Sequence, residues 1–78
     1  MKVRIRYFAV LRERRGREEE WVEVIDGETL GAIYARLFPP TRDGVLPIAY
    51  ARNREYTTAA DRPEEGDEIS FLPPIGGG

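Results

Sequence analysis

A single amphipathic helix, set between segments that alternate like strands, is the feature that most constrains the fold of this chain. Between residues 30 and 38 the apolar side chains recur at spacings of three and four, which places them on one face of a helix. They are Leu30, Ile33, Tyr34, Leu37 and Phe38. Thr29 suits the N-cap position, and the two prolines at 39–40 end the helix. The stripe is therefore predicted to face a hydrophobic core.

The opening segment alternates strictly between apolar and charged residues, which is typical of a strand covered on one side only. Its apolar positions are Val3, Ile5 and Tyr7. Its charged positions are Lys2, Arg4 and Arg6. We interpret the charged positions as a solvated sheet face rather than an anion site, because such faces are commonly charged.

The rest of the chain adds shorter strands, joined by turn residues. Further strands are predicted at 21–25, 48–53, 56–57 and 68–72. The charged segment 12–20 is predicted to be a connection, with a turn at Gly16. Further turns are expected at Asp26-Gly27, at Asn53 and at 63–67.

This order of elements predicts a small α+β domain. We expect a mixed sheet of four to five strands, one main helix packed on one of its faces, and the last strand beside the first. The predicted domain spans 1–72, and residues 73–78 form an extended tail.

Composition excludes several kinds of chemistry. The 78 residues include no cysteine and no histidine, so disulfides, thiolate metal sites and histidine acid-base catalysis are not available. We expect no metal site. The net charge of −2 argues against nucleic acid as a partner. Apolar runs fall far short of the roughly 20 residues that span a bilayer. With no signal-peptide pattern at the start, we expect a cytoplasmic protein that does not bind membranes.

The tail indicates the function. After Phe71-Leu72 come two prolines, an isoleucine and three glycines, with no charge among the last eight residues. The prolines favour an extended course, and glycine can enter a channel too narrow for side chains. Fully extended, the segment from Leu72 to Gly78 would span about 20 Å. These features favour a tail that presents its terminal carboxylate to a partner. The alternative is a frayed chain end.

Three segments resemble a known family: 3–16, 51–56 and 66–78. The sequence Gly66-Asp67-Glu68-Ile69-Ser70-Phe71-Leu72-Pro73-Pro74 with the terminal glycines is the most specific. The chain resembles the small subunit of molybdopterin synthase, in the ubiquitin-like sulfur-carrier group that also contains the thiazole-synthesis carrier. The resemblance implies a β-grasp fold, and the paired prolines favour the molybdopterin branch. Family members usually end in two glycines after a small or polar residue, whereas Gly76 makes a third here.

The resemblance implies a sulfur carrier that is not catalytic alone. A ubiquitin-activating-like adenylating enzyme would use ATP to activate the carboxylate of Gly78, and a sulfur donor would convert it to a thiocarboxylate. The chain itself would bind no cofactor. Its sulfur would pass to cyclic pyranopterin monophosphate in the large synthase subunit, within a complex of two small and two large subunits.

The resemblance also implies which residues contact the partners. Gly76 and Gly77, with Pro73 and Pro74, would occupy the tail channel of the partner. Phe8, Tyr56 and Leu72 match the hydrophobic docking surface of the family, although simple core packing is the alternative for them. Arg12 would pair with an acidic group of the adenylating enzyme, unless it is merely solvated.

Three other functions stay open from the sequence. The carrier could serve thiazole synthesis or tRNA thiolation, since the chemistry of the tail would be the same. It could instead be a protein modifier that forms isopeptide bonds to lysines of target proteins. The last alternative is a small interaction domain with an inert tail.

Overall fold

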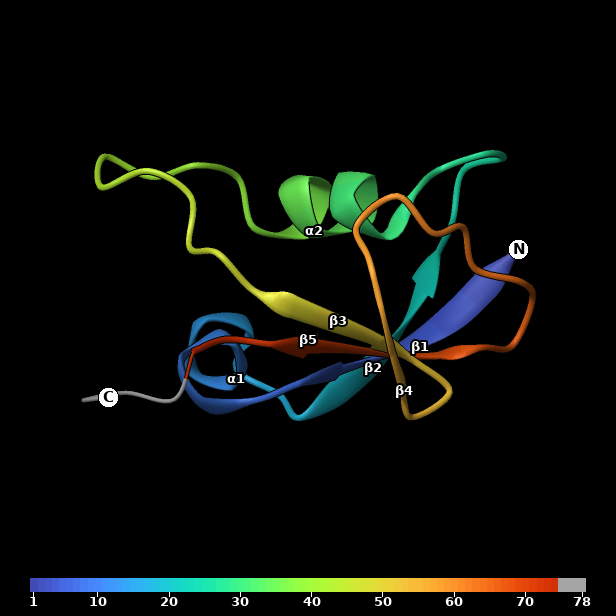
Figure 1. The fold of residues 1–78 in the computed structure, drawn as a ribbon. Helices are drawn as coiled ribbons and strands as arrows, with labels where there is room; N and C mark the ends of the chain where they lie inside the picture. Colours follow the sequence, from blue (N-terminus) through green and yellow to red (C-terminus); the bar gives the residue numbers. More distant parts are fainter. Residues whose placement is uncertain (75–78) are drawn as a thin grey trace.

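The computed structural model describes residues 1–74 and has one five-stranded mixed sheet, in the order β2-β1-β5-β3-β4 (Figure 1). The strands are β1 (Lys2–Tyr7), β2 (Glu19–Glu23), β3 (Ala49–Arg52), β4 (Glu55–Thr57) and β5 (Glu68–Leu72). The helices are α1 (Ala9–Arg15) and α2 (Leu30–Leu37). The central strands β1 and β5 are parallel, and the other neighbours are antiparallel. The predicted sheet, with the last strand beside the first, is confirmed.

The core lies between the sheet and α2, which crosses one face of the sheet (Figure 1). The apolar positions of β1 are all buried there, as their alternation predicts. Phe71 of β5 is fully buried at the centre, in contact with the rings of Tyr7, Tyr34, Phe38 and Tyr50. These edge-to-face and tilted contacts add to the hydrophobic stabilisation of the buried rings.

The start of α2 is held in two ways. The Thr29 hydroxyl accepts a hydrogen bond from the N–H of Ala32 at 3.1 Å, which confirms the predicted N-cap. The N–H groups of Leu30 and Gly31 donate to carbonyls of the segment 58–67, which rises from β4 to the helix. A Cβ at Gly31 would lie 2.9 Å from the Cβ of Ala59, so only glycine allows this close approach.

The prediction for the charged segment 12–20 is partly wrong. Its first residues belong to α1, which ends at Gly16 with φ 76°. Only Leu11 is fully buried in this seven-residue helix, so there is no apolar stripe for a sequence pattern to show. Strand β2 was predicted at 21–25 but begins at Glu19 and ends at Glu23. Its ladder with β1 runs from the pair Arg6 and Glu19 to the pair Lys2 and Glu23.

The β3–β4 hairpin closes with a two-residue loop in which both residues have positive φ. Asn53 has φ 52° and Arg54 has φ 69°. Such loops match the twist of a hairpin, and the second position usually carries glycine. The predicted turn at Asn53 is confirmed, whereas Arg54 occupies a backbone conformation that side chains disfavour.

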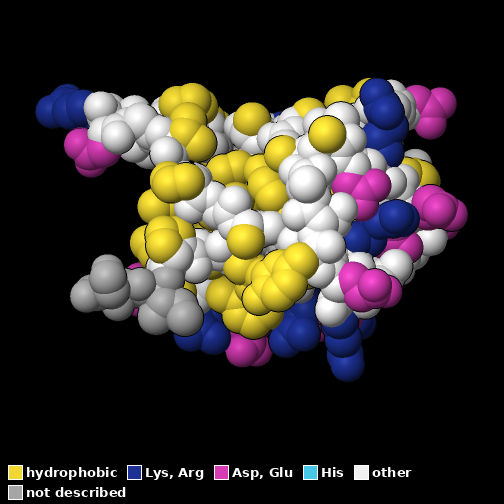
Figure 2. All heavy atoms as spheres, in the orientation of Figure 1, with side chains coloured by type: hydrophobic (Ala, Val, Ile, Leu, Met, Phe, Trp, Pro, Cys, Tyr) yellow, Lys and Arg dark blue, Asp and Glu magenta, His cyan; other side chains and the backbone are white. Residues whose placement is uncertain are grey.

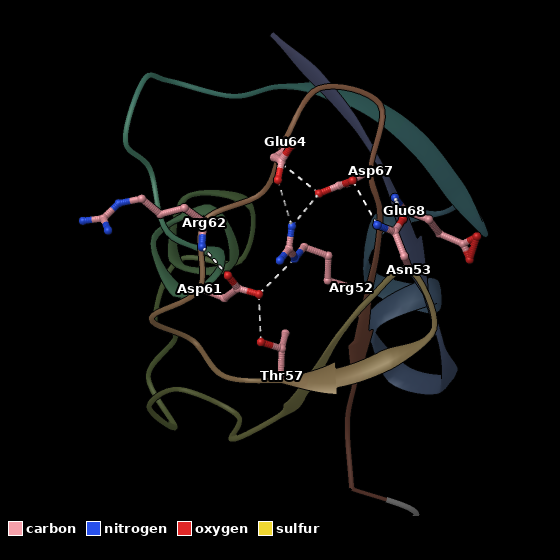
Figure 3. Close-up of polar contacts among 8 residues, drawn as sticks. All are labelled: Arg52, Asn53, Thr57, Asp61, Arg62, Glu64, Asp67 and Glu68. Atoms are coloured by element: carbon pink, nitrogen blue, oxygen red, sulfur yellow. Dashed lines mark hydrogen bonds and ion pairs between the residues drawn. The ribbon is translucent and has the colours of Figure 1, made fainter.

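Ion pairs hold together the end of the sheet where β3 ends and β5 begins (Figure 3). We call this group the Arg52 cluster and define it as Arg52, Asp61, Glu64 and Asp67. Arg52 Nε donates to Asp61 at 3.0 Å, and its Nη1 lies 3.3 Å from Asp67 and 3.8 Å from Glu64. Asp67 also accepts from the side-chain amide of Asn53 at 3.0 Å and from the N–H of Glu64 at 2.8 Å. This cluster fixes the segment 58–67 against the hairpin.

Candidate functional site

An apolar groove lies at the root of the tail. Because β1 and β5 are parallel, their carboxyl ends reach the same end of the sheet, where the antiparallel β3 begins. The groove encloses about 740 Å³. It is lined by Phe8, Ala9, Pro47, Ile48, Ala49, Tyr56, Leu72, Pro73 and Pro74. Figure 2 shows hydrophobic side chains gathered at the front and left of the molecule, where β3, β4 and the end of β5 lie in Figure 1.

The structure brings three of the sequence-predicted contact residues together in this groove. Phe8 and Leu72 are half-buried and do not belong to the buried core. Tyr56 is 82% exposed, on the short edge strand β4. The three side chains come from positions far apart in the sequence, and the sheet places them around one hollow.

The first two residues of the tail lie at this groove. Pro73 and Pro74 follow β5 directly and form part of the groove wall. Ile75, Gly76, Gly77 and Gly78 lie outside the described residues.

Arg12 does not belong to the groove. It lies on α1, is exposed, and forms a long ion pair with Glu18 at 3.7 Å. The predicted contact between Arg12 and the adenylating enzyme stays a prediction.

Sequence reasoning did not find four lining residues, namely Ala9, Pro47, Ile48 and Ala49. Pro47, Ile48 and Ala49 become neighbours of the tail root through the antiparallel pairing of β3 with β5, in which Ala49 lies opposite Leu72. Ala9, the first residue of α1, has a φ of 49°, a conformation that no sequence pattern signals for alanine. The register of the sheet, rather than any motif, assembles this side of the groove.

The groove is suited to apolar contact rather than to catalysis. Among its lining residues only Tyr56 has an ionisable side chain. Within residues 1–74, no three acidic, cysteine or histidine side chains gather to hold a metal ion. No helix of this part of the chain is long and apolar enough to cross a membrane. Burial of a partner's apolar side chain in the groove would contribute about 25 cal/mol per Å².

Comparison with known proteins places this geometry in a class. A solved structure of SAMP1, the small archaeal modifier protein 1 from Haloferax volcanii, matches with a TM-score of 0.78 and 27% identity over 100% of both chains. A complex of subunits 1 and 2 of the molybdopterin-converting factor from Helicobacter pylori contains a match with a TM-score of 0.65 and 26% identity, again over 100% of both chains. The fold is therefore the ubiquitin-like β-grasp fold, as predicted.

The sequence comparisons give the family. Residues 5–78 match the model of the ThiS family. The chain is 32% identical over its full length to the molybdopterin synthase sulfur carrier subunit of Chlamydomonas reinhardtii, which it also covers completely. This chain belongs to the ThiS family, and the predicted resemblance to the small subunit of molybdopterin synthase is confirmed.

Proposed function

We propose that this chain is a sulfur carrier in molybdenum cofactor biosynthesis. The observation that carries this proposal is the full-length similarity to a molybdopterin synthase sulfur carrier subunit. The groove at the root of the tail supports it, because a carrier must dock while its tail enters another protein. The family match also extends through the terminal glycines to residue 78.

The proposed chemistry takes place at the carboxylate of Gly78. A carboxylate is a poor electrophile until one of its oxygens becomes part of a leaving group. The adenylating partner would transfer AMP from ATP to this oxygen, with release of pyrophosphate. A sulfur nucleophile supplied by the donor would then displace AMP at the acyl carbon and leave a thiocarboxylate. Gly76 and Gly77 would pass through the partner's channel because they have no side chains to obstruct it.

The catalytic groups of this proposal come from the partners. The chain has neither cysteine nor histidine. It would supply docking and a reactive end, and would bind no cofactor of its own. The large synthase subunit would bind the groove and accept sulfur for cyclic pyranopterin monophosphate. The Helicobacter pylori complex of subunits 1 and 2 supports a partner of this kind.

The mass of the intact chain, isolated from its native cells during cofactor synthesis, tests the proposal. We expect a species in which one oxygen is replaced by sulfur, located at Gly78 by fragmentation. A chain lacking Gly77 and Gly78, expressed in the same cells, is the control and should stay unmodified. A wild-type chain that keeps an ordinary carboxylate under these conditions would contradict the carrier role.

The similarity to SAMP1 favours a second candidate function, that of a protein modifier. In this case the carboxylate of Gly78 would form isopeptide bonds with lysine side chains of other proteins. The same mass experiment separates the two functions, because conjugates would resist reducing agents and disappear when the last two glycines are removed. Conjugates without any thiocarboxylate form would replace the first proposal with the second.

A further inference from the structure

A second hollow lies beside the groove, on the sheet face that α2 leaves uncovered. The ladder places Arg6, Ser70, Ala51 and Tyr56 in one row across β1, β5, β3 and β4. Two small residues, Ser70 and Ala51, form the floor between larger side chains. The hollow encloses about 220 Å³. It is lined by Ala51, Arg54, Tyr56, Ser70 and Leu72, and so shares two of its walls with the groove.

This hollow has an excess of positive charge at its rim. Three guanidinium groups surround the carboxylate of Glu68, which is only 9% exposed. Arg4 donates to Glu68 Oε1 at 3.0 Å. Arg6 and Arg54 only approach Oε2, at 3.7 Å and 3.6 Å, and this buried oxygen accepts no hydrogen bond within residues 1–74.

Arg6 and Arg54 keep their donors available. Neither guanidinium donates a hydrogen bond to another residue in the described part of the chain. The Arg6 guanidinium lies over the ring of Phe8, 5.3 Å from its centre, and so contacts a residue of the groove wall. Each guanidinium has five donors, enough to contact Glu68 and a second carboxylate together.

Arg54 holds its position at a cost in backbone energy. Its φ of 69° suits glycine, yet the chain has here a long side chain that is 80% exposed. The side chain makes one loose ion pair and no hydrogen bond within residues 1–74. Because this disfavoured conformation is matched by so few contacts within the fold, it indicates that Arg54 contacts another molecule.

From these observations we propose that the hollow receives an acidic side chain of the partner protein that docks in the groove. The methylene groups of this side chain would pack on Tyr56 and Leu72, and its carboxylate would bind Arg54 and Arg6. This inference rests on the proposed function and adds to it the charge of the partner's contact. A cationic side chain would be repelled, and a purely apolar one would remove water from the arginines without giving them a partner.

Binding of the full-length chain to the large molybdopterin synthase subunit, measured by calorimetry at low and high salt, tests the inference. At low salt we expect about threefold to tenfold weaker binding for Arg54→Gly, and more than tenfold for Arg54→Glu. Both differences should shrink in high salt, which screens exposed charges. The melting temperature of Arg54→Gly should be unchanged or higher, because glycine suits this turn.

The control is Arg42→Glu, at an exposed position in the loop on the α2 side of the sheet. It should bind within twofold of the wild type. Equal binding by all three variants, or an equal loss for Arg42→Glu and Arg54→Glu, would overturn the inference and leave the proposed function intact. A wild-type chain that does not bind the large subunit would overturn the proposed partner and the inference together.

Discussion

The two ends of the sheet differ in how their side chains are satisfied: charged groups pair at one end, and apolar groups stay exposed at the other. At the end that holds the Arg52 cluster, the charged groups satisfy one another, through Asp61 and Asp67 in particular (Figure 3). At the tail end, apolar side chains such as Tyr56 and Leu72 lie open around a groove. Within residues 1–74, one end is completed by contacts inside the fold, and the other leaves apolar side chains exposed.

The Arg52 end contributes contacts that stabilise the fold, whereas the tail end offers exposed apolar side chains that a partner could contact. The segment 58–67 has no helix or strand of its own, so the Arg52 cluster and its contact with α2 hold it in place. The tail end is built on the same sheet, but its exposed side chains line the groove. Substitutions at the two ends should therefore separate the two properties.

The largest effect is expected for Asp67→Ala. This substitution removes the acceptor of three hydrogen bonds and leaves Arg52, Asn53 and the N–H of Glu64 without it. We expect a loss of about 2–3 kcal/mol in the free energy of unfolding, measured with urea. Glu64→Ala is the control, since its side chain is 85% exposed and should matter by less than about 0.5 kcal/mol. If the two variants are equally stable, the hydrogen bonds of Asp67 do not stabilise this end of the sheet.

The next effect belongs to the groove. Tyr56→Ala should weaken binding of the large synthase subunit by about 1–2 kcal/mol, because aromatic side chains dominate such interfaces. The free energy of unfolding of the Tyr56→Ala variant should change by less than about 0.5 kcal/mol, since Tyr56 is 82% exposed. Trp21→Ala, which removes another exposed aromatic ring outside the groove, should bind normally. A similar loss for both variants would mean that the groove is not the docking surface.

Acid should weaken the hydrogen bonds of Asp67 at the Arg52 end. Burial tends to raise the pKa of Asp67, but hydrogen bonds from the Glu64 N–H, Asn53 and Arg52 outweigh it, so the pKa falls below its ordinary value of 3.8. A lowered pKa contributes stability that is present above pH 3.8 and is lost as the pH falls through the folded value. We therefore expect the stability difference between wild type and Asp67→Asn, about 1 kcal/mol near neutral pH, to narrow below pH 3.8. Urea unfolding between pH 3 and pH 7 measures it, and a difference that widens in acid would contradict the assignment.

The smallest effect concerns the contact between α2 and the segment 58–67. Gly31→Ala should cost about 0.5–1 kcal/mol of stability, although alanine is the better helix former, because the new methyl group meets Ala59. The double variant Gly31→Ala with Ala59→Gly removes the colliding methyl group and should recover most of the loss in a urea titration. If the single variant is instead more stable than wild type, the approach of this segment to α2 is looser than the structure indicates.

The sequence predicted the parts of the fold that depend on periodicity. Alternation in β1 and the stripe of α2 are long patterns set by burial, and both were confirmed by the structure. The helix α1 was missed because its charged residues hide a single buried side chain, Leu11. Local patterns do not report an element that is held mainly by one contact.

The candidate site was less accessible to sequence reasoning. Phe8, Tyr56 and Leu72 were named through a family resemblance, and no periodicity would have joined them. Ile48 and Ala49 needed the register of β3 against β5. The approach of Arg6 and Arg54 to Glu68 could not be predicted for the same reason, since Arg6 lies near the start of the chain and Arg54 in a later hairpin loop.

The parallel pairing of β1 with β5 also keeps two reactive groups of this chain apart. Lys2, the only lysine, opens β1, whereas the tail departs beyond the opposite end of β5. The six residues of β1 correspond to about 20 Å of sheet. The end of β5, where the tail begins, and the one side-chain amine of the chain therefore lie at opposite ends of the sheet. The same strand order that builds the groove thus separates the root of the tail from Lys2 by the length of a strand.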